Sequence, residues 1–145
     1  GTNGQHSFYQ LLHQGTDIIP LQFVGFRNSQ MGTDVVIQGS TSQQKLCANV
    51  VAQIVAFACG KDDSDNNKKF EGGRPSSIII GDQLTPAALG ALLAHFENKV
   101  MFQGFIWNLN SFDQEGVQLG KILAKRVLAH ETDGALKEYS DLLGI

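Results

Sequence analysis

Two residues whose types and spacing could do chemistry lie in residues 111–121 (SFDQEGVQLGK). Gln114 and Lys121 are seven residues apart, so in a helix they share one face about 10 Å apart along the axis. A lysine side chain leans toward the N-terminus of its helix, where free N–H groups and partial positive charge favour anions. A lysine, a glutamine amide and a helix N-terminus together suit a hydroxylated, phosphorylated ligand.

Both residues also have a purely structural interpretation. Ser111 and Gln114 have the spacing of a capping box, in which the two side chains satisfy backbone N–H groups at a helix start without any ligand. Lys121 could be an ordinary solvated lysine, like Lys125 and Arg126 on the same expected helix. Spacing alone leaves both interpretations open.

His6 is a third candidate, because it ends a glycine-containing stretch, residues 1–6, and precedes an expected helix. A near-neutral imidazole at such a place can act as an acid or a base, whereas a cap or surface histidine is the structural alternative. Asp82 and Gln83 are weaker candidates, since they follow an apolar strand and ligands gather at the carboxyl ends of parallel strands. No role is assigned to the other histidines, His13, His95 and His130.

The totals exclude several classes of protein. With 145 residues, 42% of them hydrophobic, the chain can bury one core. A net charge of −3 without charged blocks argues against a nucleic-acid surface, and no apolar run or signal peptide suggests a membrane. Cys47 and Cys59 would lie about 18 Å apart in one helix, too far for a disulfide, which suggests buried thiols in a reducing compartment. No Cys/His cluster suggests a metal site.

Apolar spacing and turn residues predict strands that alternate with helices. The first half is expected to contain a turn at 1–6, a helix at 7–14 ended by Gly15, a strand at 17–26 with Pro20 near its start or at an edge, a loop at 27–40, and a helix at 41–59 capped within Ser40–Ser42 and ended by Gly60. The second half is expected to contain a solvated, partly disordered excursion at 61–75, a central covered strand at 76–80, a helix starting at Thr85–Pro86, helical residues 100–109, and helices at 111–129 and 135–143. This order predicts an α/β layered fold with a mainly parallel sheet. The opening on Gly1 without a methionine suggests a fragment or a processed piece.

Three stretches in order resemble the C-terminal part of the glucose-6-phosphate isomerase (phosphoglucose isomerase) family. They are Gly1–His6 with Phe8–Gln10 and His13–Gly15; Leu84–Pro86 with Leu89–Leu92; and Gly104–Trp107 with Asn110–Gln114, Gly116, Val117 and Lys121. The resemblance covers most of residues 1–128, and three ordered motifs are far more specific than any one of them.

The resemblance implies a sugar-isomerase (SIS-type) α/β fold, incomplete in this chain, with a core over about 1–110 and C-terminal helices over about 111–145, all forming a single C-terminal segment. It implies the interconversion of glucose 6-phosphate and fructose 6-phosphate in glycolysis and gluconeogenesis, through ring opening and a cis-enediol intermediate. It implies no metal or organic cofactor. A cytoplasmic homodimer is the expected assembly.

The resemblance also assigns roles to the three candidates. His6 is similar to the family's histidine that assists ring opening and that one protomer donates into its partner's site. Lys121 resembles the lysine that works near the ring oxygen and C1 hydroxyl, and Gln114 the glutamine that hydrogen-bonds the substrate beside the phosphate. The family's glutamate base, its Ser/Thr phosphate loop and its arginine precede the first motif, so this chain alone is expected to be inactive. None of the chain's own glutamates matches that base: Glu71, Glu97, Glu115, Glu131 and Glu138.

The chain departs from the family pattern at three positions. Glu115 stands where tryptophan is usual, Gln118 where glutamate is frequent, and Gly73 where asparagine is common. None of these removes one of the chemical groups named above. The alternative to an enzyme is a stand-alone, non-catalytic module of the same fold that binds a sugar phosphate, and a reading frame that continues upstream of Gly1 would argue against it.

Overall fold

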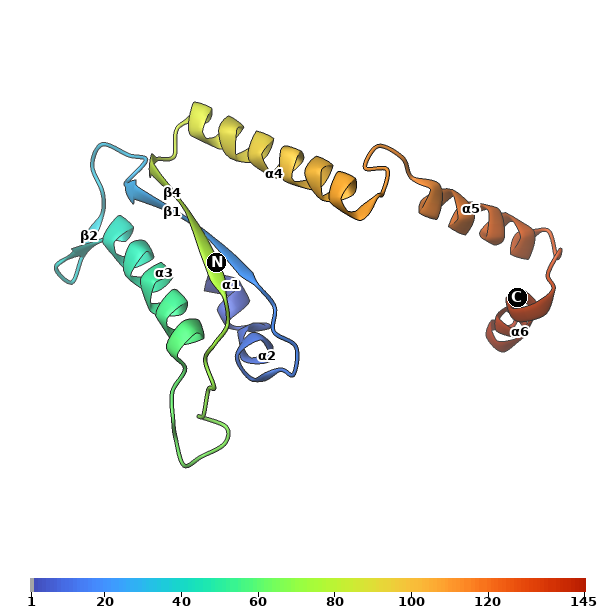
Figure 1. The fold of residues 1–145 in the computed structure, drawn as a ribbon, viewed down its shortest axis with the longest axis horizontal. Helices are drawn as coiled ribbons and strands as arrows, with labels where there is room; N and C mark the ends of the chain where they lie inside the picture. The colour runs from blue at the N-terminus through green and yellow to red at the C-terminus, as the bar shows by residue number, and fades with distance from the viewer. Residues whose placement is uncertain (1) are drawn as a thin grey trace. The chain divides into compact units, whose positions relative to one another are not determined.

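The computed structural model describes residues 2–145, which fold as two compact units, one up to Leu93 and one from Ala94 to Ile145. The elements, shown in Figure 1, are α1 (Thr2–Gln5), α2 (Tyr9–Gln14), β1 (Leu21–Asn28), β2 (Val36–Ile37), β3 (Ser40–Thr41), α3 (Ser42–Cys59), β4 (Ser76–Gln83), α4 (Pro86–Trp107), α5 (Glu115–Leu128) and α6 (Gly134–Leu143). Helix α4 runs through the boundary between the units.

The first unit is built on a parallel pair of strands, β1 and β4, which lie side by side in Figure 1. The pairing runs in register from Leu21 with Ser76 to Asn28 with Gln83. Parallel strands need a long crossover, and here that crossover contains α3, which contacts β1. Pro20 lies just before β1, where its missing N–H costs no ladder bond. The predicted α/β fold with a parallel sheet is confirmed.

The expectation that the strand at 76–80 is central and covered is wrong for this chain. Within the described residues β4 has one strand neighbour, β1, and its Ile78 and Ile80 side chains are 41% and 53% exposed. An apolar run predicts a strand whose side chains must pack against other segments, but it does not show which segments these are.

Residues 27–40, expected to form a loop, contain a small antiparallel hairpin. Val36 pairs with Thr41 and Ile37 with Ser40, across a two-residue turn. Gln38 and Gly39 have φ values of 57° and 77°, as a type I′ hairpin turn requires. The Gln-Gly pair between apolar and β-branched residues was the available signal.

Helix α3 has the predicted start and end. Thr41 Oγ1 accepts from the Gln44 N–H (3.1 Å), and Gln44 Oε1 accepts from the Thr41 N–H (2.9 Å), which completes a capping box. Gly60 ends the helix with φ 67°, and a Cβ there would lie 2.2 Å from the Phe70 carbonyl oxygen. Cys59, in the last turn, is exposed and Cys47 is half-buried, so the prediction of two buried thiols is wrong.

The charged excursion at 61–75 has defined contacts rather than disorder. Lys61 and Phe70 exchange backbone hydrogen bonds of 2.7 and 2.8 Å. The Gln14 side chain donates to the carbonyls of Asn66 (3.1 Å) and Lys69 (2.9 Å), which fastens the excursion to α2. Gly73 has φ 65°, a left-handed conformation that glycine and asparagine tolerate better than other residues.

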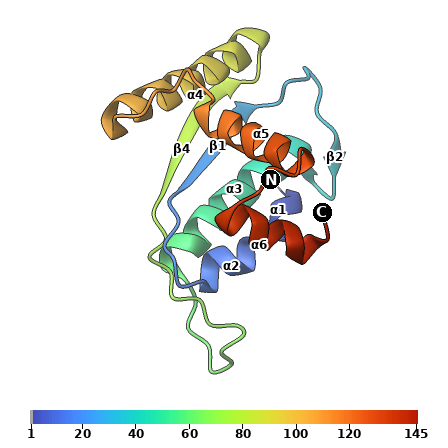
Figure 2. The same cartoon turned by 90° about the vertical axis from the view of Figure 1, so that its right-hand side faces the viewer.

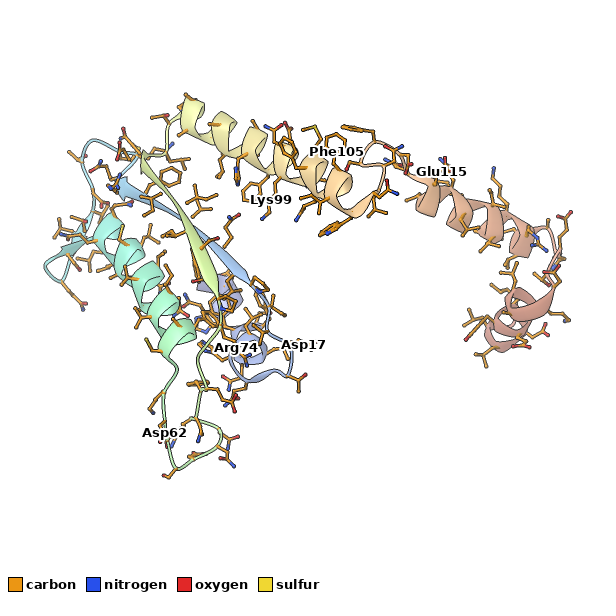
Figure 3. The ribbon with its side chains drawn as sticks, viewed as in Figure 1. Asp17, Asp62, Arg74, Lys99, Phe105 and Glu115 are labelled. Carbon is orange, nitrogen blue, oxygen red and sulfur yellow. The ribbon has the colours of Figure 1, made fainter. Side chains whose placement is uncertain are left out.

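Phe57 of α3, whose side chain is fully buried, forms the centre of the first unit. The His13 ring stacks on it at 3.9 Å and the Tyr9 ring lies at 5.4 Å, so α2 packs against the C-terminal half of α3 (Figure 2). Arg74, labelled in Figure 3, is buried and donates 3.0 Å hydrogen bonds to the carbonyls of His13 and Gly15. Gly15 ends α2 as predicted, but in an extended conformation (φ −66°) rather than a left-handed one.

Helix α4 begins and continues as predicted. The Ala88 N–H donates to Thr85 Oγ1 (3.1 Å), and Pro86 occupies the first helical position. The apolar stretch at 100–109 is helical through Trp107, which confirms the interpretation as a helix. The Leu109 N–H then closes the helix on the Gly104 carbonyl (2.8 Å).

In the second unit α5 is followed closely by α6. Arg126 Nη2 forms an ion pair with Asp133 (3.1 Å) between the two helices, and Arg126 Nε donates to the Glu131 carbonyl (3.1 Å). No side chain of α5 is buried, and α6 buries Ser140, whose hydroxyl donates to the Leu136 carbonyl. Across residues 2–145, none of the helices combines the length and the apolar character that crossing a membrane requires.

Candidate functional site

His6 lies directly after a one-turn helix rather than in the simple turn that was expected at 1–6. The His6 N–H donates to the Asn3 carbonyl (3.2 Å), and the Gly4 carbonyl accepts from Ser7 and Phe8 (3.1 Å each). Helix α2 consequently begins at Tyr9 instead of Ser7. The His6 side chain is exposed, so a ligand can reach its imidazole.

The segment that carries His6 is attached to α3 at two points. Just before His6, Gln5 Nε2 donates to Asn49 Oδ1 of α3 (2.6 Å), and both residues are half-buried. Just after it, Tyr9 contacts the buried Phe57. Asn49 was not singled out in the sequence, although an amide in the middle of a largely apolar helix was an available signal.

The predicted capping box at Ser111 and Gln114 is wrong. Ser111 Oγ donates to the Val100 carbonyl of α4 (3.3 Å). The same Oγ lies against Gly104, and a Cβ added to Gly104 would come within 1.9 Å of it. Helix α5 begins three residues later than the box requires, and Gln114 itself is the N-cap, with φ −136° and ψ 35°. The Gln114 side chain forms no capping hydrogen bond.

Gln114 and Lys121 therefore occupy the N-cap and second turn of α5. Since Gln114 is outside the helix, helical periodicity no longer fixes its direction relative to Lys121. Both side chains are exposed, and within residues 3–145 neither forms a hydrogen bond or an ion pair. Glu115, labelled in Figure 3, places a carboxylate in the first turn, where it interacts favourably with the helix dipole. The structure thus places these two candidates near one helix start, whereas His6 belongs to the other unit.

Asp82 and Gln83, the weaker candidates, are engaged in contacts at the end of the strand pair. Asp82 forms an exposed ion pair with Arg27 (2.6 Å), and Gln83 Nε2 donates to the Ser29 carbonyl (2.8 Å). They fasten the carboxyl ends of β1 and β4, and no chemical role is needed to explain them.

A cleft of about 640 Å³ lies between α3 and the strand pair, and its lining does not include His6. It is mainly apolar, with Val24, Phe26 and Ile80 on the strands facing Leu46 and Val50 on α3. At the N-terminus of α3, beside the cleft, a carboxylate of the chain accepts hydrogen bonds from backbone N–H groups. Asp34 accepts from the N–H groups of Gln43 (2.7 Å) and Val35 (2.8 Å). The Gln43 bond is the main cause that lowers the pKa of the Asp34 carboxyl below its usual value.

The fold lowers the pKa of His13. Burial, and secondarily the charge of Arg74, lower the pKa of His13 below its ordinary value of 6.5. Its ring lies between those of Phe57 and Phe70 (centroid distances 3.9 and 4.9 Å), so it packs in the centre of the first unit. Among residues 2–145 no group of three or more His, Cys, Asp or Glu residues has the arrangement of a metal site.

Comparisons with known proteins agree with the three ordered motifs. The family model described as phosphoglucose isomerase matches residues 1–141. The glucose-6-phosphate isomerase of Treponema pallidum is 68% identical over 145 residues, which is 100% of this chain and 27% of the relative. That of Chlamydia pneumoniae is 62% identical over 128 residues, 88% of this chain and 24% of the relative.

A solved structure gives the same result. The crystal structure of a glucose-6-phosphate isomerase from Chlamydia trachomatis superposes with a TM-score of 0.79 at 51% identity, covering 99% of this chain and 28% of that one. The chain thus spans about a quarter of the length of the relatives it matches. On the match to nearly its whole length, the chain belongs to the phosphoglucose isomerase family.

Proposed function

We propose that this chain acts as the single C-terminal segment of an isomerase of the relatives' length, which interconverts glucose 6-phosphate and fructose 6-phosphate in cytoplasmic glycolysis and gluconeogenesis. Support comes from the family match over residues 1–141 and from the relatives' names. In this proposal the reaction passes through ring opening and a cis-enediol, with no metal or organic cofactor. The carboxylate base comes from outside this chain, so the chain alone is inactive.

The observation that carries the proposal is the amide of Gln114, which forms no side-chain hydrogen bond within residues 3–145. The capping box was the structural explanation for this glutamine, and Ser111 bonds to Val100 instead. An exposed amide at a helix N-terminus, with Lys121 two turns along, fits a site for a phosphorylated sugar. In our proposal Gln114 hydrogen-bonds the substrate beside its phosphate.

His6 and Lys121 share the ring-opening step in this proposal. Ring opening needs one group that protonates the ring oxygen and another that takes the proton of the anomeric hydroxyl. An exposed imidazole, which follows the Gln5 that bonds to Asn49, and an exposed ammonium can divide these two transfers. We further propose a homodimer in which each protomer donates His6 to the partner's site, which is consistent with the exposure of the imidazole.

A chimera tests this proposal: the 145-residue chain replaces the matching 27% of the Treponema pallidum enzyme. We expect His6→Ala to slow turnover of cyclic glucose 6-phosphate by roughly a hundredfold or more, the effect of losing an acid–base group. The same variant should hardly change turnover of the 5-deoxy analogue of fructose 6-phosphate, which stays open because it has no hydroxyl that can close a five- or six-membered ring on its carbonyl. Equal losses with both substrates would contradict a role in ring opening.

Lys121 has a matched control on its own helix. Lys125 is one turn further along α5 and also exposed, so Lys121→Ala should lower turnover of the cyclic sugar while Lys125→Ala leaves it within about twofold. Similar losses in both variants would mean that only the general charge of α5 matters. Isomerase activity of the isolated chain near that of the chimera would overturn the proposal of a site completed elsewhere.

A further inference from the structure

We propose that the amide pair of Gln5 and Asn49 orients His6, which makes Asn49 a positioning residue for ring opening. The proposal rests on the function proposed for His6. It follows from the 2.6 Å hydrogen bond from Gln5 Nε2 to Asn49 Oδ1, which joins the residue before His6 to the middle of α3.

Helix α1 is too short to be stable, or to keep a fixed orientation, without contacts to other elements. It has four residues, one turn, and isolated helices far longer than that are marginal in water. Among the described side chains, the bond from Gln5 to Asn49 is the one hydrogen bond that ties α1 to another element. The path of the chain into His6 is therefore set by this bond together with the backbone bonds to Asn3 and Gly4.

Asn49 destabilises the middle of α3 unless its side-chain amide has a hydrogen-bond partner. Asparagine is a poor residue for a helix interior, and the residues on either side of it in the chain, Ala48 and Val50, are apolar. A half-buried amide without a partner loses its hydration without compensation. The bond to Gln5 supplies that compensation, so the residue type is explained by the contact.

A second attachment makes the positioning role separable from folding. Tyr9 packs on Phe57, eight residues further along α3, and this contact does not involve Asn49. Loss of the amide pair leaves α2 attached at that point and frees only α1 and the stretch through His6. We therefore expect a catalytic defect without unfolding, since a misplacement of about 1 Å can cost up to a hundredfold in rate.

The test uses the same chimera with both substrates. We expect Asn49→Ala to lower kcat for cyclic glucose 6-phosphate about tenfold with little change in KM, and to leave the 5-deoxy analogue unaffected, as a partial copy of His6→Ala. Asn49→Asp keeps an acceptor oxygen for Gln5 and should recover most of the rate. Gln5→Ala changes no residue of α3 and should lower kcat as much as Asn49→Ala does. The double variant should lower kcat no more than either single variant.

Gln53 supplies the control, because it lies one turn further along α3, is also half-buried, and makes no side-chain hydrogen bond within residues 3–145. Gln53→Ala should leave kcat unchanged. If His6→Ala itself fails to distinguish the two substrates, the proposed function falls. If His6→Ala distinguishes them but Asn49→Ala and Gln5→Ala slow both substrates equally, or Gln53→Ala has the same effect, the positioning proposal is overturned.

Discussion

Residues 41–44 and 111–114 carry the same pattern, a hydroxyl residue followed three positions later by glutamine, and fold differently. At Thr41 and Gln44 both bonds of a capping box form and α3 begins at Ser42. At Ser111 and Gln114 neither forms and α5 begins at Glu115. The difference shows which glutamine is occupied by the fold and which is available to a ligand.

The cause lies in the residues that come before each pattern. Thr41 ends the short strand β3 and has the extended backbone, φ −79° and ψ 160°, that an N-cap needs. Ser111 follows the end of α4, where its hydroxyl bonds to Val100 and its side chain lies against Gly104. A serine held by the preceding helix cannot also cap the next one.

Among the variants that test the contrast between the two patterns, the largest expected effect comes from replacing each glutamine with alanine in the chimera. If Gln114 binds beside a phosphate, Gln114→Ala should raise KM for glucose 6-phosphate roughly tenfold to a hundredfold, the value of a hydrogen bond to a charged group. Gln44→Ala should leave KM unchanged and destabilise α3, because it removes half of a capping box. Steady-state kinetics and hydrogen exchange of the two helix starts measure both effects.

Other patterns of effect in the two variants would contradict the proposed difference between Gln114 and Gln44. An unchanged KM in Gln114→Ala, with faster exchange at the start of α5, would show that Gln114 caps the helix in solution. A raised KM in both variants would show that the effect is indirect.

The second prediction concerns Gly104, which allows Ser111 to approach α4. Gly104→Ala would bring a Cβ within 1.9 Å of Ser111 Oγ and 3.0 Å of the Leu109 carbonyl oxygen, so we expect a loss of about 1–3 kcal/mol in the free energy of unfolding. Urea unfolding of the chimera measures the change.

Two further variants show whether the close approach is the reason. Gly104→Ala combined with Ser111→Ala removes the clashing oxygen and should recover part of the loss. Gly116→Ala in α5, where a Cβ meets nothing within 4 Å, should stabilise by up to about 1 kcal/mol. Equal losses at both glycines would mean that the effect comes from the backbone of the helix instead.

Much of the fold could be predicted because local signals and tertiary packing agree. Thr85 with Pro86 marks a helix start, and the Ile-rich run after Pro75 marks a strand. The segments that pack against that strand could not be predicted, because an apolar run does not show which other part of the chain buries it. The hairpin at Gln38 and Gly39 was missed because its strands are two residues long.

The candidate site divides in the same way. His6, Gln114 and Lys121 were selected from motifs, and their exposure is compatible with ligand binding, while their roles stay predictions. The support for His6 was not predicted, because the bond from Gln5 to Asn49 joins positions 44 residues apart in the chain. The capping box that spacing allowed at Ser111 does not form, because Ser111 bonds to Val100, and spacing contains no information about that contact.

The smallest expected effect compares the two hydroxyl residues directly. Thr41→Ala removes the acceptor of the Gln44 N–H and should cost about 1 kcal/mol, with faster hydrogen exchange at Gln44. Ser111→Ala removes one exposed bond to Val100 and should cost no more than about 0.5 kcal/mol, without faster exchange at the start of α5. Thr41→Ser keeps the acceptor and should behave like the parent chain. If Ser111→Ala selectively speeds exchange at the start of α5, Ser111 contributes to that helix start after all, and the contrast between the two patterns becomes one of degree.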